Sequence, residues 1–141
     1  MASPRHLTLV FVTPGREIVH EDVDEVELPG EEGFFGVLPG HAPLLAALKT
    51  GPMWYRSGAD KRFAFIASGF AEVLADRVSV LAEVAERAED IDIQRAEAAQ
   101  RRAEERLARP PVVEMDAERA RIALLRALSR LQVARHARPR A

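Results

Sequence analysis

The sequence predicts an all-β sandwich N-terminal domain followed by a C-terminal antiparallel two-helix hairpin. Short β-branched and aromatic segments, separated by turn residues, fill the first part of the chain. After residue 86 the spacing of apolar residues changes to the helical period, and the segment 91–107 contains neither Gly nor Pro. We therefore expect residues 1–86 to form the sandwich and residues 87–141 to form the hairpin.

Composition excludes several classes of function. The chain has 141 residues, of which 48% are hydrophobic and 30% are charged, so it can bury a core. It has no cysteine, and its four histidines are isolated, so we expect no metal site. Its net charge of −2 argues against a nucleic-acid partner. No apolar run approaches the roughly 18 residues of a membrane span, so we expect no direct membrane insertion and a cytoplasmic location.

The strands are predicted from apolar segments that end at turn signals such as Pro14-Gly15 and Gly51-Pro52. Two pairs of segments flank short polar turns and predict β-hairpins. The predicted strands span residues 7–13, 18–19, 26–28 and 44–48, then 53–56 with 62–67 as one hairpin, and 70–74 with 78–81 as another.

A glycine-rich stretch runs from Gly30 to Leu45 and is the most constrained part of the sequence. Its spacing alone favours a bulged hairpin in an ordinary sandwich over a binding loop. A phosphate-binding P-loop is excluded, because no glycine-rich segment ends in Gly-Lys-Ser or Gly-Lys-Thr. Adjacent residues of a strand point to opposite faces, so we expect Phe34 and Phe35 not to enter the core together.

Two helices follow, each with an alanine-rich stripe. The first is predicted over 91–107, with Asp90 and Asp92 at its start and Pro110-Pro111 as its stop. The second is predicted from Asp116, as N-cap, to about residue 134. The predicted stripes are Ala96, Ala99, Ala103 and Leu107 on the first helix, and Ala120, Ala123, Leu124, Ala127, Leu128 and Leu131 on the second. Alanine buries little area, so we expect a mobile C-terminal half and a frayed tail from residue 135.

Arginines line one face of each predicted helix. One interpretation is a solvated face with ion pairs such as Glu97 with Arg101 and Glu105 with Arg109. Arg126 and Arg130, however, have no carboxylate three or four positions away. Two unpaired guanidinium groups one turn apart repel each other, which leaves an anion site as the alternative to the solvated face. The faces comprise Asp92, Arg95 and Arg102 on the first helix and Arg119, Arg126 and Arg130 on the second.

Four motifs, in their order and spacing, give nearly the whole chain a family resemblance. They are Glu32-Gly33-x-x-Gly36-x-x-Pro39-Gly40-His41-x-Pro43-Leu44, Ser68-Gly69-Phe70-x-Glu72-Val73, Val78-x-Val80-Leu81 and Ala85-Glu86-Arg87-Ala88-Glu89-Asp90-Ile91-Asp92. With them the chain resembles the epsilon subunits of bacterial F-type ATP synthases. The resemblance implies a non-catalytic rotor subunit of the central stalk, peripheral to the bacterial inner membrane on its cytoplasmic side. It also implies a sandwich docked on the gamma subunit and the c-ring, and a hairpin that can extend to the catalytic alpha/beta head and inhibit ATP hydrolysis.

The resemblance further implies a regulatory ATP that is bound but not turned over. Some members of the family bind ATP on the folded hairpin through a motif that Ile91-Asp92-Ile93-Gln94-Arg95-Ala96 matches. The implied ATP-binding residues are Glu86, Ile91, Asp92, Arg95, Ala96, Arg102, Arg126 and Arg130. The implied rotor-docking residues are Phe34, Phe35, Gly36 and His41.

The sequence departs from the family at two points. Phe34 stands where the family usually has an acidic residue, and the predicted hairpin loop is apolar, with Pro110-Pro111 and Val112-Val113. No catalytic residue is expected, because no nucleophile or acid/base pair stands out. A free-standing ATP-sensing module with the same two parts is the alternative, and it would not need the shaped glycine-rich edge.

Overall fold

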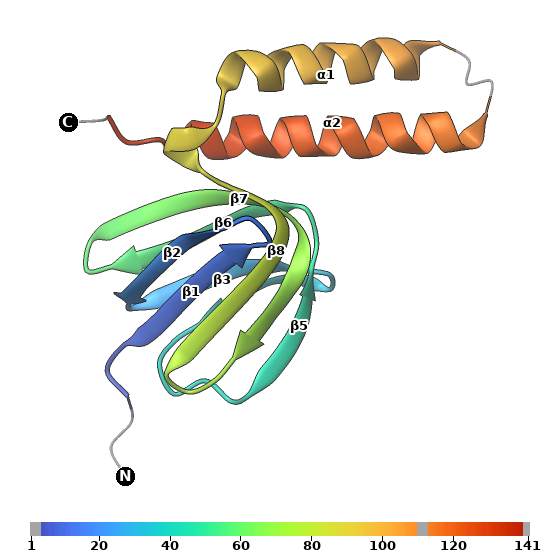
Figure 1. Cartoon of the computed structure of the whole chain (residues 1–141). Coiled ribbons are helices and arrows are strands. Elements are labelled where there is room, and N and C mark those ends of the chain that lie inside the picture. Colours follow the sequence, from blue (N-terminus) through green and yellow to red (C-terminus); the bar gives the residue numbers. More distant parts are fainter. Residues whose placement is uncertain (1–3, 110–112, 140–141) are drawn as a thin grey trace.

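The computed structural model describes residues 4–109 and 113–139 and contains, within them, eight β-strands, a short 3-10 helix and two α-helices (Figure 1). This confirms the predicted fold class. The strands are β1 Leu7–Thr13, β2 Arg16–Val23, β3 Glu25–Gly30, β4 Gly33–Val37, β5 Leu44–Leu48, β6 Gly51–Ser57, β7 Asp60–Val73 and β8 Arg77–Arg87. The helical elements are η1 Ala88–Asp90, α1 Ile93–Ala108 and α2 Glu114–Ala134.

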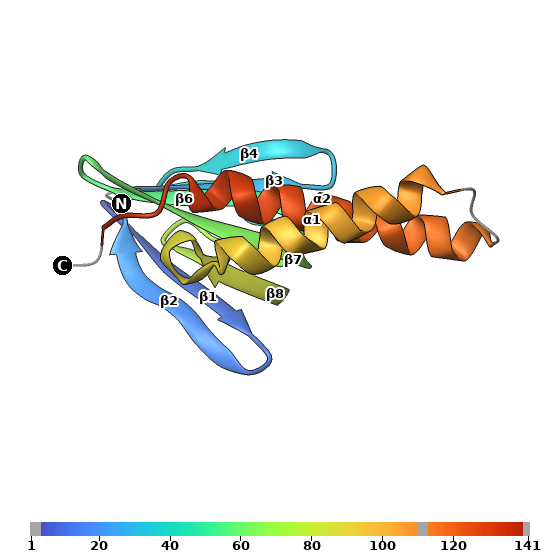
Figure 2. The ribbon, with the colours of Figure 1, turned by 90° about the horizontal axis from the view of Figure 1, so that it is seen from above.

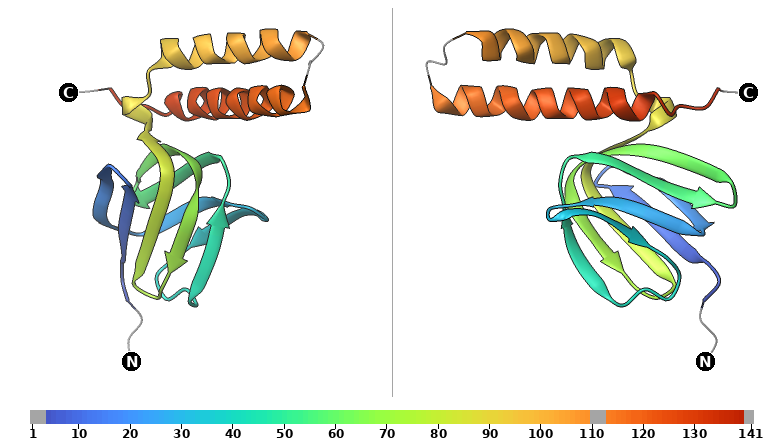
Figure 3. Two further views of the ribbon diagram at one scale, coloured as in Figure 1. Left: turned by 45° about the vertical axis from the view of Figure 1, so that its right-hand side comes forward. Right: turned by 180° about the vertical axis from the view of Figure 1, so that it is seen from behind.

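The strands form a sandwich in the order β2-β1-β8-β7-β5-β3-β4, and β6 pairs with both β3 and β7 (Figure 3). The β1–β8 pair is parallel, whereas the other pairs are antiparallel. Strand β2 spans eight residues, where the sequence predicted only 18–19, because its exposed polar residues pair with β1 along the edge of the sheet.

Strand β7 is shared between two neighbours. Its first half pairs with β6, and its second half pairs with β5. The sequence predicted two strands here, and the structure corrects this to one bent strand, because Ser68 adopts a positive φ of 55° between the two halves. A Cβ at Gly69 would lie 2.2 Å from the carbonyl oxygen of Leu81, so the bend brings β7 and β8 too close for any other residue.

The glycine-rich stretch contains the β3–β4 hairpin. Its register is continuous from the pair Val26 and Val37 to the pair Gly30 and Gly33, and Gly33 has a φ of 131°. The predicted hairpin is therefore confirmed, but without the predicted bulge, and β4 is a strand that the sequence alone did not separate from the stretch. The two other predicted hairpins, β6–β7 and β7–β8, are also present.

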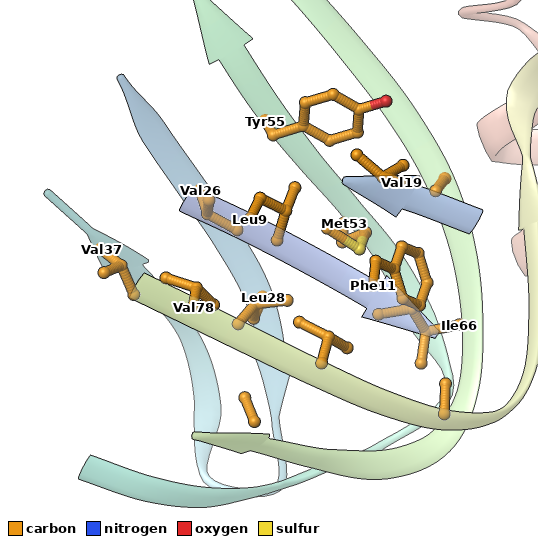
Figure 4. Close-up of a cluster of buried hydrophobic side chains, with 14 of the residues drawn as sticks. Leu9, Phe11, Val19, Val26, Leu28, Val37, Met53, Tyr55, Ile66 and Val78 are labelled. Atoms are coloured by element: carbon orange, nitrogen blue, oxygen red, sulfur yellow. The ribbon is translucent and has the colours of Figure 1, made fainter. Parts of the chain in front are cut away.

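The main core lies between the two layers of strands (Figure 4). Its largest fully buried side chains include Phe11, Leu28, Met53 and Ile66. Phe11 on β1 and Met53 on β6 alternate with more exposed neighbours along their strands. Phe35 packs against this core, although it is only partly buried. The sandwich therefore has a complete core without help from the helices.

The helices lie side by side as an antiparallel pair across one end of the sandwich, and the C-terminal part of α1 and the N-terminal part of α2 extend beyond it (Figure 2). Asp92 is the N-cap of α1, where its carboxylate accepts a hydrogen bond from the Arg95 amide at 3.1 Å. The predicted N-cap of α2 is wrong: α2 begins at Glu114 after Val113, and Asp116 lies in its first turn. The predicted Pro110-Pro111 stop lies outside the described residues.

The predicted stripes are correct in part. The small residues that the helices bury are Ala96, Ala103, Ala117, Ala120 and Ala127. Ala123, Leu107 and Leu128 are exposed, contrary to the prediction. The C-terminal end of α2 instead buries Ser129, Val133 and Ala134. The reason is that this end of α2 faces the sandwich as well as α1, so the buried face changes along the helix.

A second, smaller core joins the hairpin to the sandwich. It consists of Phe65, Ala67, Ala88, Ile91, Val133 and Ala134, with Phe63 and Val84 packed against it. Because Phe65 and Ala67 belong to β7, the face of β7 that is turned away from the main core is covered by the end of α2. The helix ends at Ala134, as predicted, but the described tail up to residue 139 contacts the sandwich, since His136 stacks on Phe63 and Arg138 pairs with Asp60.

Candidate functional site: an arginine-lined pocket and an open apolar face

A polar pocket of ≈ 280 Å³ lies where β8, α1 and α2 meet. Strand β8 supplies Glu86, and α2 supplies Arg130. Helix α1 supplies residues at positions 92, 95, 96, 99 and 102, which recur at helical spacing and so share one face. Its lining residues are Val84, Glu86, Asp92, Arg95, Ala96, Ala99, Arg102 and Arg130.

The pocket brings together most of the residues that the sequence assigned to ATP. Glu86, Asp92, Arg95, Ala96, Arg102 and Arg130 all line it. Ile91 does not; it is 8% exposed and belongs to the second core, where it anchors the start of α1. Arg126 is not part of the lining. The small side chains of Ala96 and Ala99 leave the space that the arginines surround.

Arg130 is held from two sides. Its Nε donates to Glu86 Oε1 at 2.5 Å, and its guanidinium carbon lies 4.6 Å from the centre of the Phe65 ring. The expectation that Arg130 is unpaired is therefore wrong, because its partner comes from β8 and not from its own helix. Sequence reasoning within a helix could not find a partner 44 residues away.

Arg126 differs from Arg130. Within residues 4–109 and 113–139, its Nε is buried without a hydrogen-bond partner, as is the hydroxyl of Ser129. A buried donor without a partner costs stability, so a group that accepts from it would be favoured. Arg126, one turn before Arg130, therefore remains a candidate to donate a hydrogen bond to an anion.

The expected ion pairs on the helix surfaces form elsewhere. The structure records no pair of Glu97 with Arg101 or of Glu105 with Arg109 in the part of the chain that it describes. Instead Arg121 contacts Glu114 at 2.8 Å and Glu118 at 2.7 Å, and these two carboxylates raise the pKa of its guanidinium. This solvated cluster lies on α2, outside the pocket lining.

Arginines outnumber carboxylates in the pocket lining. Three arginines face two carboxylates; of these, Glu86 is occupied by Arg130 and Asp92 by capping α1. Arg95 and Arg102 are exposed, and no ion pair is recorded for either among the described residues. Planar guanidinium groups that converge in this way suit phosphate oxygens.

The glycine-rich edge forms a second hollow of ≈ 520 Å³, between residues 30–35 and 44–47. Phe34 is 54% exposed there, whereas Phe35 turns toward the core. The two side chains thus do point to opposite faces. Gly36 is exposed, and His41 is half-buried with its Nδ1 2.6 Å from the Ala42 carbonyl oxygen.

Sequence reasoning missed an exposed apolar patch on the outer face of β5, β7 and β8, formed by Leu45, Phe70 and Leu81. These side chains are 73%, 57% and 58% exposed, and Phe70 and Leu81 form a cross-strand pair. We call these three residues the outer patch; beside it lies an apolar hollow of ≈ 440 Å³. The available signal was that apolar residues occupy both faces of these strands, which indicates a strand covered on both sides.

The chain thus combines a β-sandwich that carries an exposed apolar patch with a helical hairpin that helps to form an arginine-lined pocket. Two family descriptions match consecutive parts of the chain: the β-sandwich domain of the ATP synthase delta/epsilon chain over residues 6–88, and its long α-helix domain over residues 89–135. The chain therefore belongs to the ATP synthase delta/epsilon family, as an epsilon subunit, which is a non-catalytic component of the complex.

Individual relatives support the same family assignment. The ATP synthase epsilon chain of Solibacter usitatus is 50% identical over 131 residues, which are 93% of this chain and 97% of that one. The ATP synthase epsilon chain of Nitratidesulfovibrio vulgaris (strain DP4) is 50% identical over 129 residues, 92% of this chain and 96% of that one.

Solved structures show the same fold. A chain of the Euglena gracilis mitochondrial ATP synthase OSCP/F1/c-ring assembly matches with a TM-score of 0.83 and 26% identity, covering 96% of this chain and 85% of that one. A chain of the Tetrahymena thermophila mitochondrial central stalk and c-ring matches in fold alone, with a TM-score of 0.63 and 13% identity over 95% of this chain and 99% of that one.

The described part of the chain was also searched for two other features. Neither described helix is long and apolar enough to cross a membrane. The described residues contain no group of three or more metal-ligating side chains.

Proposed function

We propose that this epsilon subunit couples rotation in the central stalk and restrains ATP hydrolysis through its hairpin, with ATP as the ligand that holds the hairpin folded. The observation that carries the proposal is the pocket, which draws its residues from β8, α1 and α2 together. Glu86 belongs to the sandwich, whereas Arg102 and Arg130 belong to different helices. A ligand that needs all three elements stabilises only the arrangement in which they meet.

The phosphates of ATP would neutralise Arg95 and Arg102 from one helix and Arg130 from the other. Arg126, one turn before Arg130 and with a buried unpartnered Nε, is proposed as a fourth cation for the phosphates, although it does not line the pocket. An extended hairpin would separate these groups. ATP at a hundredfold excess over its dissociation constant would favour the folded form by about 2.7 kcal/mol.

At low ATP the hairpin would leave the sandwich and reach the catalytic alpha/beta head. Departure is physically feasible because the buried faces of the helices are mostly alanine, and an alanine stripe contributes little to burial. Extension would also break the second core, which includes Phe65 and Val133.

The gamma subunit and the c-ring are the proposed docking partners of the sandwich. The outer patch supplies the apolar surface, and the hollow at the glycine-rich edge supplies Phe34 beside the carboxylates of Glu31 and Glu32. The Euglena neighbour, whose assembly contains F1 and the c-ring, supports this placement. The chain would thereby lie peripheral to the bacterial inner membrane, on its cytoplasmic side.

A free-standing ATP sensor is the alternative function. It would share the arginine-lined pocket, but it would have no use for an outer patch that exposes Leu45 by 73% to solvent. The outer patch therefore favours the rotor subunit.

Co-purification tests the proposal. The tagged chain is expected to capture the gamma subunit and the catalytic subunits from detergent-solubilised membranes. ATP hydrolysis by the stripped enzyme is expected to fall when the chain is added, and less so at high ATP. A chain that binds ATP but captures no ATP synthase subunit would favour the free-standing sensor, whereas capture without any effect of ATP on inhibition would remove the nucleotide part of the proposal.

A further inference from the structure

The segment that follows α2 lies against the β6–β7 hairpin of the sandwich. His136 and Ala137 continue the helix with turns, donating to the Val133 and Ala134 carbonyl oxygens at 2.9 and 3.1 Å. The His136 ring then stacks on Phe63 of β7, with the ring centres 3.7 Å apart and the planes inclined by 12°. The end of α2 is thus attached to the sandwich by a contact outside the arginine-lined pocket.

Phe63 offers a fixed platform for this stack. It packs against the second core and is paired across the strands with Trp54 of β6. The Lys61 ammonium lies 3.8 Å from the centre of a Trp54 ring and 5.7 Å from that of Phe63. Lys61, Trp54, Phe63 and His136 therefore form one cluster of aromatic and cationic side chains on the sheet. In this cluster, His136 comes from the segment after α2, whereas the other three residues come from β6 and β7.

Arg138 adds a polar contact beside the stack. Its guanidinium donates to Asp60 Oδ1 at 3.3 Å and to the Lys61 carbonyl oxygen at 3.4 Å. The two side chains of this ion pair are 38% and 63% exposed, so the pair by itself contributes little. It does, however, direct the tail along the β6–β7 turn, so that His136 faces Phe63.

We propose that His136 and Arg138 form a C-terminal latch that holds the end of α2 on the sandwich independently of nucleotide. The latch goes beyond the proposed function, because it predicts a folded hairpin that is stabilised before any ligand arrives. Extension of the hairpin must separate His136 from Phe63 at the same time as it removes Val133 from the second core. The latch residues do not line the pocket, although they hold the same helix that carries Arg130.

The contacts of the latch allow an estimate of how much its loss would change the ratio of docked to undocked hairpin. A stacked aromatic pair contributes enough to change the ratio of docked to undocked hairpin by about two- to twelvefold. Loss of the Arg138 contact is expected to change it by less than about fivefold.

Hydrogen exchange on the full-length chain without nucleotide measures this ratio directly. In His136→Ala, the amides of the C-terminal half of α2 are expected to lose two- to twelvefold protection. His136→Phe keeps a stacked ring and should restore most of it. Arg135→Ala removes a neighbouring exposed cation and is the matched control, with unchanged protection. The β1 amides report global stability and should not change in any variant.

Equal protection of α2 in wild type and His136→Ala would overturn the latch, as would an equal loss in His136→Phe. A second arm repeats the exchange with millimolar ATP. If ATP raises α2 protection in wild type and in His136→Ala alike, the latch and the nucleotide act independently, as proposed. If ATP changes neither while the latch variants still differ, the latch stands and the nucleotide proposal fails.

Discussion

Glu86 and Arg130 meet across the junction of the sandwich and the hairpin, with 2.5 Å between Oε1 and Nε. Each side chain is 27% exposed, so the pair is shielded from solvent more than a surface ion pair. Because β8 provides the carboxylate and α2 the guanidinium, the pair forms only when the hairpin lies on the sandwich. It therefore links the position of the hairpin to the shape of the arginine-lined pocket.

Replacing this carboxylate by its neutral isostere is expected to loosen the hairpin. Glu86→Gln keeps an acceptor near Arg130 but turns a charge-assisted hydrogen bond into a weaker one, at a cost of about 1 kcal/mol in hairpin docking. Hydrogen exchange of α2 would register this loss. Glu97→Gln, which removes an exposed carboxylate of α1, is the control, and an equal effect of the two changes would show that net charge and not the pair matters.

Close packing of the two helices depends on small side chains. Ala120 is 1% exposed, so Ala120→Leu should force the helices apart and destabilise the hairpin by about 1–3 kcal/mol. Ala123 lies on the exposed side of the same helix, and Ala123→Leu should be nearly neutral. Helical circular dichroism during thermal unfolding distinguishes the two. Similar losses for both variants would mean that Ala123 also faces α1, as the sequence alone suggested.

The two helices show which structural features the spacing of residues in the sequence can predict. The spacing of alanines predicted both helices, their approximate ends and the burial of Ala96 and Ala103. It could not predict that the end of α2 packs on the sandwich, because that contact depends on where β7 presents Phe65. Helical spacing alone assigns Leu128 to the buried stripe, but in the structure this side chain is 45% exposed.

The bend in β7 should tolerate no side chain at Gly69. A Cβ there would lie 2.2 Å from the Leu81 carbonyl oxygen, and Gly69→Ala must therefore move β7 away from β8. We expect a loss of about 3 kcal/mol in the free energy of unfolding, measured by urea denaturation. Gly15→Ala, whose Cβ would meet nothing within 4 Å, should cost far less, and parity between them would contradict the close approach.

Substitutions of Phe34 and Phe35 should have different effects, the first on docking and the second on the free energy of unfolding. Phe34→Ser removes a side chain that is 54% exposed, so it should change the free energy of unfolding by less than about 0.5 kcal/mol and weaken capture of the gamma subunit or the c-ring. Phe35→Ser removes a side chain packed on the core and should cost about 2 kcal/mol. If Phe34→Ser leaves assembly unchanged, the glycine-rich edge is not a docking surface.

The candidate site was predictable to the extent that it lies on one helix. Asp92, Arg95, Ala96 and Arg102 share a face of α1 at regular spacing, which a sequence reveals. The pairing of Arg130 with Glu86 and the outer patch arise from strands and helices that meet in three dimensions. Spacing within one helix carries no information about the pairing of Arg130 with Glu86, whereas the outer patch left a signal in the apolar residues on both faces of its strands.

Calorimetric titration of ATP tests the central claim most directly. Wild type is expected to bind ATP at or below millimolar concentration, and Arg102→Ala, which removes a cation that lines the pocket, should weaken binding at least tenfold. Arg101→Ala removes the same charge from the adjacent position of α1, which does not line the pocket, and should bind as wild type does. The double variant Arg126→Ala with Arg130→Ala should not bind measurably. No ATP binding by wild type, or equal affinity of the Arg101→Ala and Arg102→Ala variants, would contradict a nucleotide site between the helices and the sandwich.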